Sequence, residues 1–255
     1  MEQSNQSTEI QQLRDRLFRR FHEACQQYQL LQNDDHILIG LSGGKDSLLL
    51  TELLGRQAHI YVPRIRVTAV HIRVKERNYS SDINYLEEFC HRHDVPFIVR
   101  DTTIVPLRQG PNTEQENSRE KDPCFLCSWY RRKALLDLAQ ELGCTRIALG
   151  HHQDDILHTL LLNLIYQGSF AAMPPRLKLD KMPLEYIRPL CLTQESDIQR
   201  YATLMDYHKQ ATLCPYEHAS SRAEVRQLYK QLEQMNPNVR SSLWNAIHNI
   251  KLSYL

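Results

Sequence analysis

Ile37-Leu38-Ile39-Gly40-Leu41-Ser42-Gly43-Gly44-Lys45-Asp46-Ser47-Leu48 combines an apolar run, a glycine pair and several polar side chains. Residues 37–41 are mostly apolar and predict a buried parallel strand. The glycine-rich turn leads into a predicted helix over 47–55, which we expect to end at Gly55. A strand, a glycine turn and a helix N-terminus together direct several backbone N–H groups at one anion. The stretch therefore predicts a phosphate site at the end of a strand.

The side chains of this turn suit a bound nucleotide, although an ordinary tight strand-to-helix turn is the alternative. The glycine pair lets the main chain approach a phosphate closely, and the serine hydroxyls add donors. Lys45 supplies a mobile positive charge, and Asp46 supplies a carboxylate for the magnesium that accompanies a nucleotide. We assign catalytic roles to Lys45 and Asp46. The nucleotide-binding residues predicted here are Ser42, Gly43, Gly44, Lys45, Asp46 and Ser47.

The spacing of the turn excludes a Walker A loop. That pattern needs a Gly six residues before its Lys and a Ser or Thr directly after it, whereas Ile39 and Asp46 stand at those places. The hexapeptide Ser-Gly-Gly-Lys-Asp-Ser instead resembles the PP-loop of the ATP pyrophosphatases, which cleave ATP between its α and β phosphates. The resemblance implies ATP as the nucleotide.

The composition places the chain among globular proteins. Its 255 residues suffice for one large domain, or for one domain with a small appendage. A net charge of +1 creates no whole-molecule field toward nucleic acid, so an RNA surface must be local. The polar N-terminus excludes a signal peptide, and no uncharged apolar run reaches membrane-spanning length. Seven cysteines, an odd number, indicate mostly free thiols in a reducing cytoplasm.

Strands alternate with helices along the chain, which predicts an α/β fold with a doubly wound parallel sheet of about five strands. The expected strands are 37–41, 64–74, 96–101 and 146–150, with 176–179 and 184–189 as a hairpin or edge strand. The expected domains are an N-terminal helix over 1–30, a PP-loop ATP pyrophosphatase domain over 31–210 with a loop insert at 103–123, and a cysteine-containing loop with C-terminal helices over 211–255.

Three motifs fall at the carboxyl ends of the predicted strands, where such sheets bind ligands. They are the glycine turn, the strand end near His71, and the segment from Gly150 to Asp155. Acids in the first turn of a helix ordinarily serve as caps. We expect Asp155 to supply in addition a second, catalytic carboxylate for magnesium. We also expect Gly150 to leave room for the nucleotide and His71 to lie beside the nucleotide.

The cysteines divide into two groups. Cys124 and Cys127 form a C-x-x-C at the start of a predicted helix, and Cys214 lies far away in a loop. From the residues alone this is a redox pair, half of a zinc site with His218 as a further ligand, or an iron–sulfur site completed by Cys214. The remaining cysteines lie in apolar segments and are expected to be small buried hydrophobes: Cys25, Cys90, Cys144 and Cys191.

The set of motifs resembles the TtcA family of tRNA 2-thiocytidine synthetases. It comprises Ser-Gly-Gly-Lys-Asp-Ser, Pro-Cys-x-x-Cys followed by Arg131-Arg132, Gly-His-His-x-Asp-Asp-Ile-Leu, and Met-Pro-Pro-Arg followed by Ile-Arg-Pro-Leu, in the family's order. The resemblance extends from about residue 14 to the C-terminal helices. It implies ATP- and Mg²⁺-dependent thiolation of cytidine 32 in the tRNA anticodon loop.

The same resemblance implies a 4Fe–4S cluster held by Cys124, Cys127 and Cys214, whose iron would keep an open coordination site to carry sulfide to the base. The chain departs from the family at Ala211, where relatives have the first cysteine of a second C-x-x-C, and it is short at both ends. The implied partners are tRNA and a sulfur donor such as a cysteine desulfurase system, with no membrane and with a homodimer as a possible assembly.

Three other functions are compatible with the sequence. A PP-loop ligase of the lysidine-synthetase or amidating type would use an amine and need no cysteine cluster. A zinc-bearing thiolase would receive sulfur as a persulfide or from a carrier protein. A non-catalytic nucleotide-binding module would bind ATP without splitting it to AMP.

Overall fold

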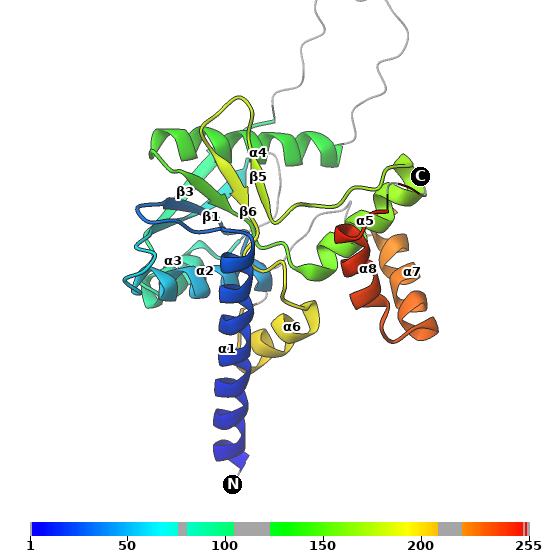
Figure 1. The fold of residues 1–255 in the computed structure, drawn as a ribbon. Coiled ribbons are helices and arrows are strands. Elements are labelled where there is room, and N and C mark those ends of the chain that lie inside the picture. Colours follow the sequence, from blue (N-terminus) through cyan, green and yellow to red (C-terminus); the bar gives the residue numbers. More distant parts are fainter. Residues whose placement is uncertain (1, 76–80, 105–122, 209–220, 252, 254–255) are drawn as a thin grey trace, which may run out of the picture.

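The computed structural model describes residues 2–75, 81–104, 123–208, 221–251 and 253. Its centre is a six-stranded sheet with the order β3-β2-β1-β4-β6-β5, in which only β5 runs antiparallel to its neighbour (Figure 1). The strands are β1 His36–Gly40, β2 Arg66–Val74, β3 Phe97–Thr102, β4 Arg146–Ala148, β5 Arg176–Lys178 and β6 Glu185–Ile187. The predicted α/β fold is confirmed, since the expected five strands are the parallel ones and the β5–β6 hairpin adds the antiparallel edge.

Helices cover both faces of this sheet (Figure 1). One face packs against α4, through a cluster that includes Leu135 and Leu138, and the other face carries the larger core with α1, α2, α3 and α6. A third apolar cluster joins α5 to α7 and α8. The helices are α1 Glu2–Gln27, α2 Lys45–Ala58, α3 Ile83–Arg92, α4 Pro123–Glu141, α5 Gln153–Gln167, α6 Glu195–Leu204, α7 Ser221–Met235 and α8 Val239–His248. Among the described residues, no helix combines the length and apolar character that a membrane span requires.

Two glycines that the sequence marks as helix ends behave differently. Gly143 follows α4 with a φ of 62°, the left-handed conformation expected of a helix terminator. Gly55 lies inside α2, which continues to Ala58, so the expected end at Gly55 is wrong. A Cβ on Gly55 would lie 2.6 Å from the carbonyl oxygen of His93, just after α3. Gly55 therefore serves the close packing of two helices, which nothing local in the sequence reveals.

A buried ion network joins the start of β1 to β4 and β6. Arg146, only 3% exposed, donates to Asp35 Oδ2 at 2.6 Å and to Glu185 Oε2 at 2.5 Å. Arg176 on the edge strand β5 also donates to Glu185, with Nε 2.7 Å from Oε2. Opposite charges thus hold the ends of three parallel strands in register.

Replacing Arg146 with methionine is expected to lower the free energy of unfolding by about 3–5 kcal/mol, because it leaves the buried Asp35 carboxylate without its cation, while Glu185 keeps Arg176. Urea denaturation measures the change. Arg200→Met is the matched control, since Arg200 pairs with Glu9 at the surface, and its cost should stay below about 1 kcal/mol. Equal stability of the two variants would show that the network does not stabilise the fold.

Candidate active site

The glycine turn follows β1 directly and is held in shape by its own serines. The Ser47 hydroxyl donates to the carbonyl oxygen of Gly44 at 2.9 Å and lies 3.1 Å from the Ser42 hydroxyl. The backbone N–H of Gly44 donates to Ser42 Oγ at 3.3 Å. Gly43 has a φ of 87°, a conformation that glycine adopts without strain. The predicted nucleotide loop is thus a closed turn at the N-terminus of α2.

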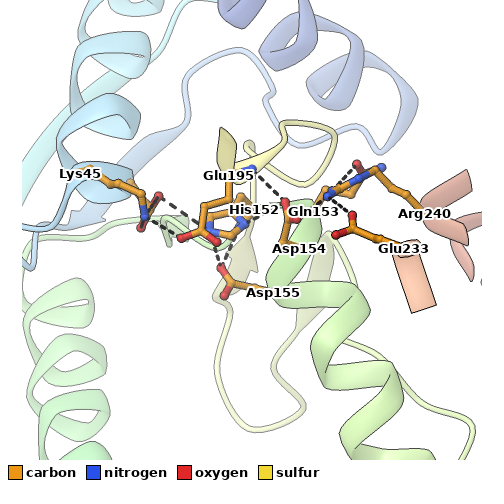
Figure 2. A network of polar contacts seen from close by, with 9 residues as sticks. Lys45, His152, Gln153, Asp154, Asp155, Glu195, Glu233 and Arg240 are labelled. Carbon is orange, nitrogen blue, oxygen red and sulfur yellow. Dashed lines mark hydrogen bonds and ion pairs between the residues drawn. The ribbon is translucent and has the colours of Figure 1, made fainter. Parts of the chain in front are cut away.

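Lys45 is held between two carboxylates (Figure 2). Its ammonium lies 3.2 Å from Asp46 Oδ1 and 3.0 Å from Glu195 Oε1, although Glu195 belongs to the distant helix α6. Burial by itself would lower the pKa of Lys45, but the charges of Asp46 and Glu195 outweigh that effect and raise it. Lys45 therefore stays protonated at neutral pH, as a phosphate-binding cation must. Glu195 was not among the site residues predicted from the sequence.

His152 lies at the centre of the acidic groups in Figure 2. It is 2% exposed, and its Nε2 lies 3.4 Å from Asp155 Oδ2 and 3.8 Å from Asp46 Oδ1. Its backbone N–H donates to Asp155 Oδ2 at 3.1 Å. Among the described residues, the buried atoms His152 Nδ1 and Asp46 Oδ1 make no hydrogen bond, although His152 Nδ1 lies 3.6 Å from Asp154 Oδ2 and Asp46 Oδ1 lies 3.2 Å from the Lys45 ammonium. Because buried polar atoms are nearly always satisfied, these atoms indicate a site that a ligand completes.

The neighbouring acids Asp154 and Asp155 point to different partners (Figure 2). Asp154 accepts from Arg240 Nη2 of α8 at 2.6 Å and from the backbone N–H of Glu195 at 2.8 Å. Although burial would raise the pKa of Asp154, its bond to Arg240 prevails and lowers it. Asp154 thus ties α5 to α6 and α8. Both acids lie beside the His152 ring, with Asp154 Oδ2 3.6 Å from Nδ1 and Asp155 Oδ2 3.4 Å from Nε2, but only Asp154 is bonded to Arg240 and to the backbone of Glu195.

His71 on β2 and Gly150 after β4 lie on opposite sides of the glycine turn, because β2 and β4 are the two neighbours of β1 in the sheet. The His71 ring is buried, and its Nδ1 lies 2.9 Å from the carbonyl oxygen of Leu41, the residue before the turn. Burial lowers the pKa of His71, so its ring is neutral at physiological pH. A Cβ on Gly150 would lie 3.1 Å from the backbone carbon of Asp46 and the backbone nitrogen of Ser47. Gly150 therefore allows the strand end after β4 to approach the turn.

The predicted cluster ligands lie partly outside the described residues. Positions 124 and 127 fall on one face of the first turns of α4, and the Cys127 side chain is half-buried. Cys214 and the alternative ligand His218 lie outside the described residues. Within the described part of the chain, no three potential ligand side chains gather as a metal site. Buried as expected are Cys25, Cys90, Cys144 and Cys191.

Comparison with known proteins identifies the family. The PP-loop domain matches residues 13–232. The tRNA-cytidine(32) 2-sulfurtransferase of Paraburkholderia phytofirmans is 35% identical over 243 residues, which are 94% of this chain and 70% of that protein. The enzyme of the same name from Acaryochloris marina is 35% identical over 256 residues, covering 99% of this chain and 87% of that protein.

A solved structure has the same fold. The U34-tRNA thiolase NcsA from Methanococcus maripaludis, determined with its 4Fe–4S cluster, superimposes with a TM-score of 0.71 at 24% sequence identity. The match covers 92% of this chain and 80% of NcsA. Together with the converging PP-loop residues, these similarities show that the chain belongs to the tRNA-cytidine(32) 2-sulfurtransferase family of PP-loop enzymes.

Proposed function

We propose that this enzyme uses ATP and Mg²⁺ to activate cytidine 32 of a tRNA anticodon loop and then replaces its C2 oxygen with sulfur. The observation that carries the proposal is the convergence of Lys45, Asp46 and Asp155 around His152, beside the PP-loop, in a chain of this family. The names of the curated relatives supply the substrate class, namely cytidine 32 of tRNA.

The turn suits a pyrophosphate group. The N-terminus of α2 begins at Lys45, so the free backbone N–H groups of the helix and its positive dipole end meet at the turn. Within the described residues the buried Asp46 Oδ1 accepts no hydrogen bond and has the Lys45 ammonium 3.2 Å away, and Gly150 has no side chain to intrude. Mg²⁺ typically binds one or two carboxylates together with substrate phosphates, and Asp46 and Asp155 would hold it here, where it would neutralise the charge of the leaving pyrophosphate.

The chemistry requires two displacements. The cytidine O2 attacks the α-phosphorus of ATP, the bond from this phosphorus to the bridging oxygen breaks, and pyrophosphate leaves. Lys45 and the N–H groups of the turn stabilise the charge that develops on the pyrophosphate. A sulfur nucleophile then adds to C2, and AMP departs with the original O2. An anticodon-loop base is suited to this reaction because unstacking it costs little.

A 4Fe–4S cluster is the second proposed cofactor, with Cys124, Cys127 and Cys214 as its ligands. The spacing of the first two places them on one face of α4, as ligands of one cluster require. When bound, such a cluster with three protein thiolates supplies a coordination site for exogenous sulfur. NcsA, which shares the fold, contains a 4Fe–4S cluster.

The proposal extends to organisation and partners. We propose that residues 31–210, with the insert 103–123, form the catalytic PP-loop domain, flanked by the helix over 1–30 and by the cysteine-containing loop and helices over 211–255. The enzyme would receive its sulfur from a donor such as a cysteine desulfurase system and act in the cytoplasm, with a homodimer as the assembly to test by light scattering.

The test is anaerobic purification followed by assay with a tRNA transcript, ATP, Mg²⁺ and sulfide. We expect one AMP and one pyrophosphate per 2-thiocytidine formed, and about four irons and four sulfides per chain that are lost in Cys214→Ala. Zinc in place of iron, lost in His218→Ala, would instead favour the zinc-bearing thiolase. Activity that survives alanine at all three cysteines would favour an amine-using ligase, and ATP bound but never split would favour a binding module.

Replacing Glu195 with glutamine is expected to reduce kcat for AMP formation by about 10-fold or more, because Lys45 loses a charged partner that orients it. Steady-state kinetics with tRNA measures the change. Glu233→Gln is the control, since Glu233 neutralises Arg240 at the edge of the same network and does not contact Lys45. Unchanged kcat in Glu195→Gln would reduce the role of Glu195 to that of a first-turn acid in α6.

A further inference from the structure

The two buried arginines of the described residues have different partners. Arg146 is neutralised by Asp35 and Glu185. Arg188 is 7% exposed, and the one hydrogen bond of its side chain within the described structure runs from Nη1 to the carbonyl oxygen of Pro174, at 2.5 Å. No carboxylate of the described residues lies within ion-pair distance of Arg188. A buried guanidinium without a counter-charge is costly, which indicates that an anion binds there.

The sheet places Arg188 next to the active site. It is the first residue after β6, and β6 is the parallel neighbour of β4, with Ile187 opposite Ala148. Gly150 and His151 follow β4, so both strand ends open onto the same carboxyl edge as the glycine turn of β1. Adjacent strands lie about 4.8 Å apart. Arg188 is therefore two strands from the turn, on the side away from His71.

Other buried polar atoms near Arg188 also have no hydrogen-bond partner in the part of the chain that the structure describes. They are the Nδ1 atom of His151 and the hydroxyl of Tyr186, which lies on β6 two residues before Arg188. Burial, together with the charge of Arg188 and that of Arg222 in the first turn of α7, lowers the pKa of His151 to about 4, although Asp155 opposes the shift. At neutral pH the histidine is thus a neutral hydrogen-bonding group.

From this arrangement we infer a second phosphate-binding subsite, formed by Arg188 and His151, distinct from the pyrophosphate site of the glycine turn. A guanidinium offers several N–H donors in the planar geometry that phosphate oxygens accept, and a neutral imidazole can donate another hydrogen bond. The inference rests on the proposed function for its ligand. The phosphate is either the α-phosphate that remains on the nucleotide after pyrophosphate leaves or a backbone phosphate of the RNA beside the target base.

The test measures binding rather than turnover. Dissociation constants for AMP, for pyrophosphate and for a tRNA transcript are determined separately by calorimetry and fluorescence, on the full chain and on Arg188→Met. Arg200→Met, which removes an arginine from the surface of α6, is the control for loss of one positive charge. His151→Ala is a second variant, for the case that Arg188→Met does not fold. His151 makes no hydrogen bond to Pro174, so we expect its removal to leave the fold intact.

We expect both variants to lose about 10- to 100-fold in affinity for one phosphate source and none for pyrophosphate. Weaker AMP binding with unchanged tRNA binding would show that the subsite binds the α-phosphate of the nucleotide. Weaker tRNA binding, with the slope of log K against log salt reduced by about 0.7–0.9 in Arg188→Met, assigns an RNA phosphate. Unchanged affinities for AMP and tRNA in folded variants, or an equal loss for pyrophosphate, would overturn the separate subsite. Thiolation is not a readout, so failure to form 2-thiocytidine would count against the proposed function alone.

Discussion

Asp46→Asn is expected to reduce ATP-dependent release of pyrophosphate by about 10³-fold, while the chain stays folded and keeps the iron of the proposed cluster. Asp46 lies beside Lys45 in the first turn of α2, and its buried Oδ1 accepts no hydrogen bond from the described residues. Burial raises the pKa of Asp46, while the charges of Lys45 and His152 oppose the rise. An amide of the same shape removes the negative charge that would hold Mg²⁺ against the phosphates, and it leaves Lys45 with Glu195 as its one charged partner in Figure 2.

Pyrophosphate release is measured in single-turnover experiments with tRNA present, and iron content and the visible spectrum are measured on the same sample. Asp137→Asn is a matched control, because Asp137 pairs with Lys133 on the surface of α4 and the substitution makes the same chemical change far from the turn. Turnover at the wild-type rate in Asp46→Asn would overturn the role proposed for this carboxylate.

Gly150→Ala is expected to reduce the same activity by about 100-fold and to cost about 1–3 kcal/mol of stability. The added Cβ would lie 3.1 Å from the backbone carbon of Asp46 and the backbone nitrogen of Ser47. Neither atom belongs to a flexible side chain, so the glycine turn itself must move. A shift of the turn misplaces Lys45 and the N–H groups that we assign to the leaving pyrophosphate, which is why activity should fall more steeply than stability.

The control for this substitution is Gly40→Ala on β1. A Cβ there would meet the Leu149 side chain, with Cδ2 at 3.2 Å, and a leucine side chain can rotate away. Thermal unfolding and single-turnover rates of the two variants are compared directly. Equal rates in Gly150→Ala and Gly40→Ala would show that activity does not depend on the close approach of position 150 to the turn.

The sequence predicted the local elements of the site correctly where short-range patterns determine them. The strand over 37–41, the turn after it and the presence of the helix that follows were predicted from hydrophobic periodicity and glycine placement, and the α5 N-terminus was predicted from its acids. The predicted end of α2 was wrong because Gly55 serves close packing against the backbone just after α3, which is distant in sequence. No residue near Gly55 in the chain carries that information.

What the sequence by itself determined is the family, the alternation of strands and helices, and the placement of three motifs at one edge of the sheet, since these depend on residues a few positions apart. The tertiary structure decided which side chains meet there. It brought Glu195 to Lys45, separated the roles of Asp154 and Asp155, centred the cluster on His152 and left Arg188 buried with no carboxylate of the described residues beside it. These contacts join residues from separate strands and helices, and strand order and helix packing, rather than any local pattern, set the distances between them.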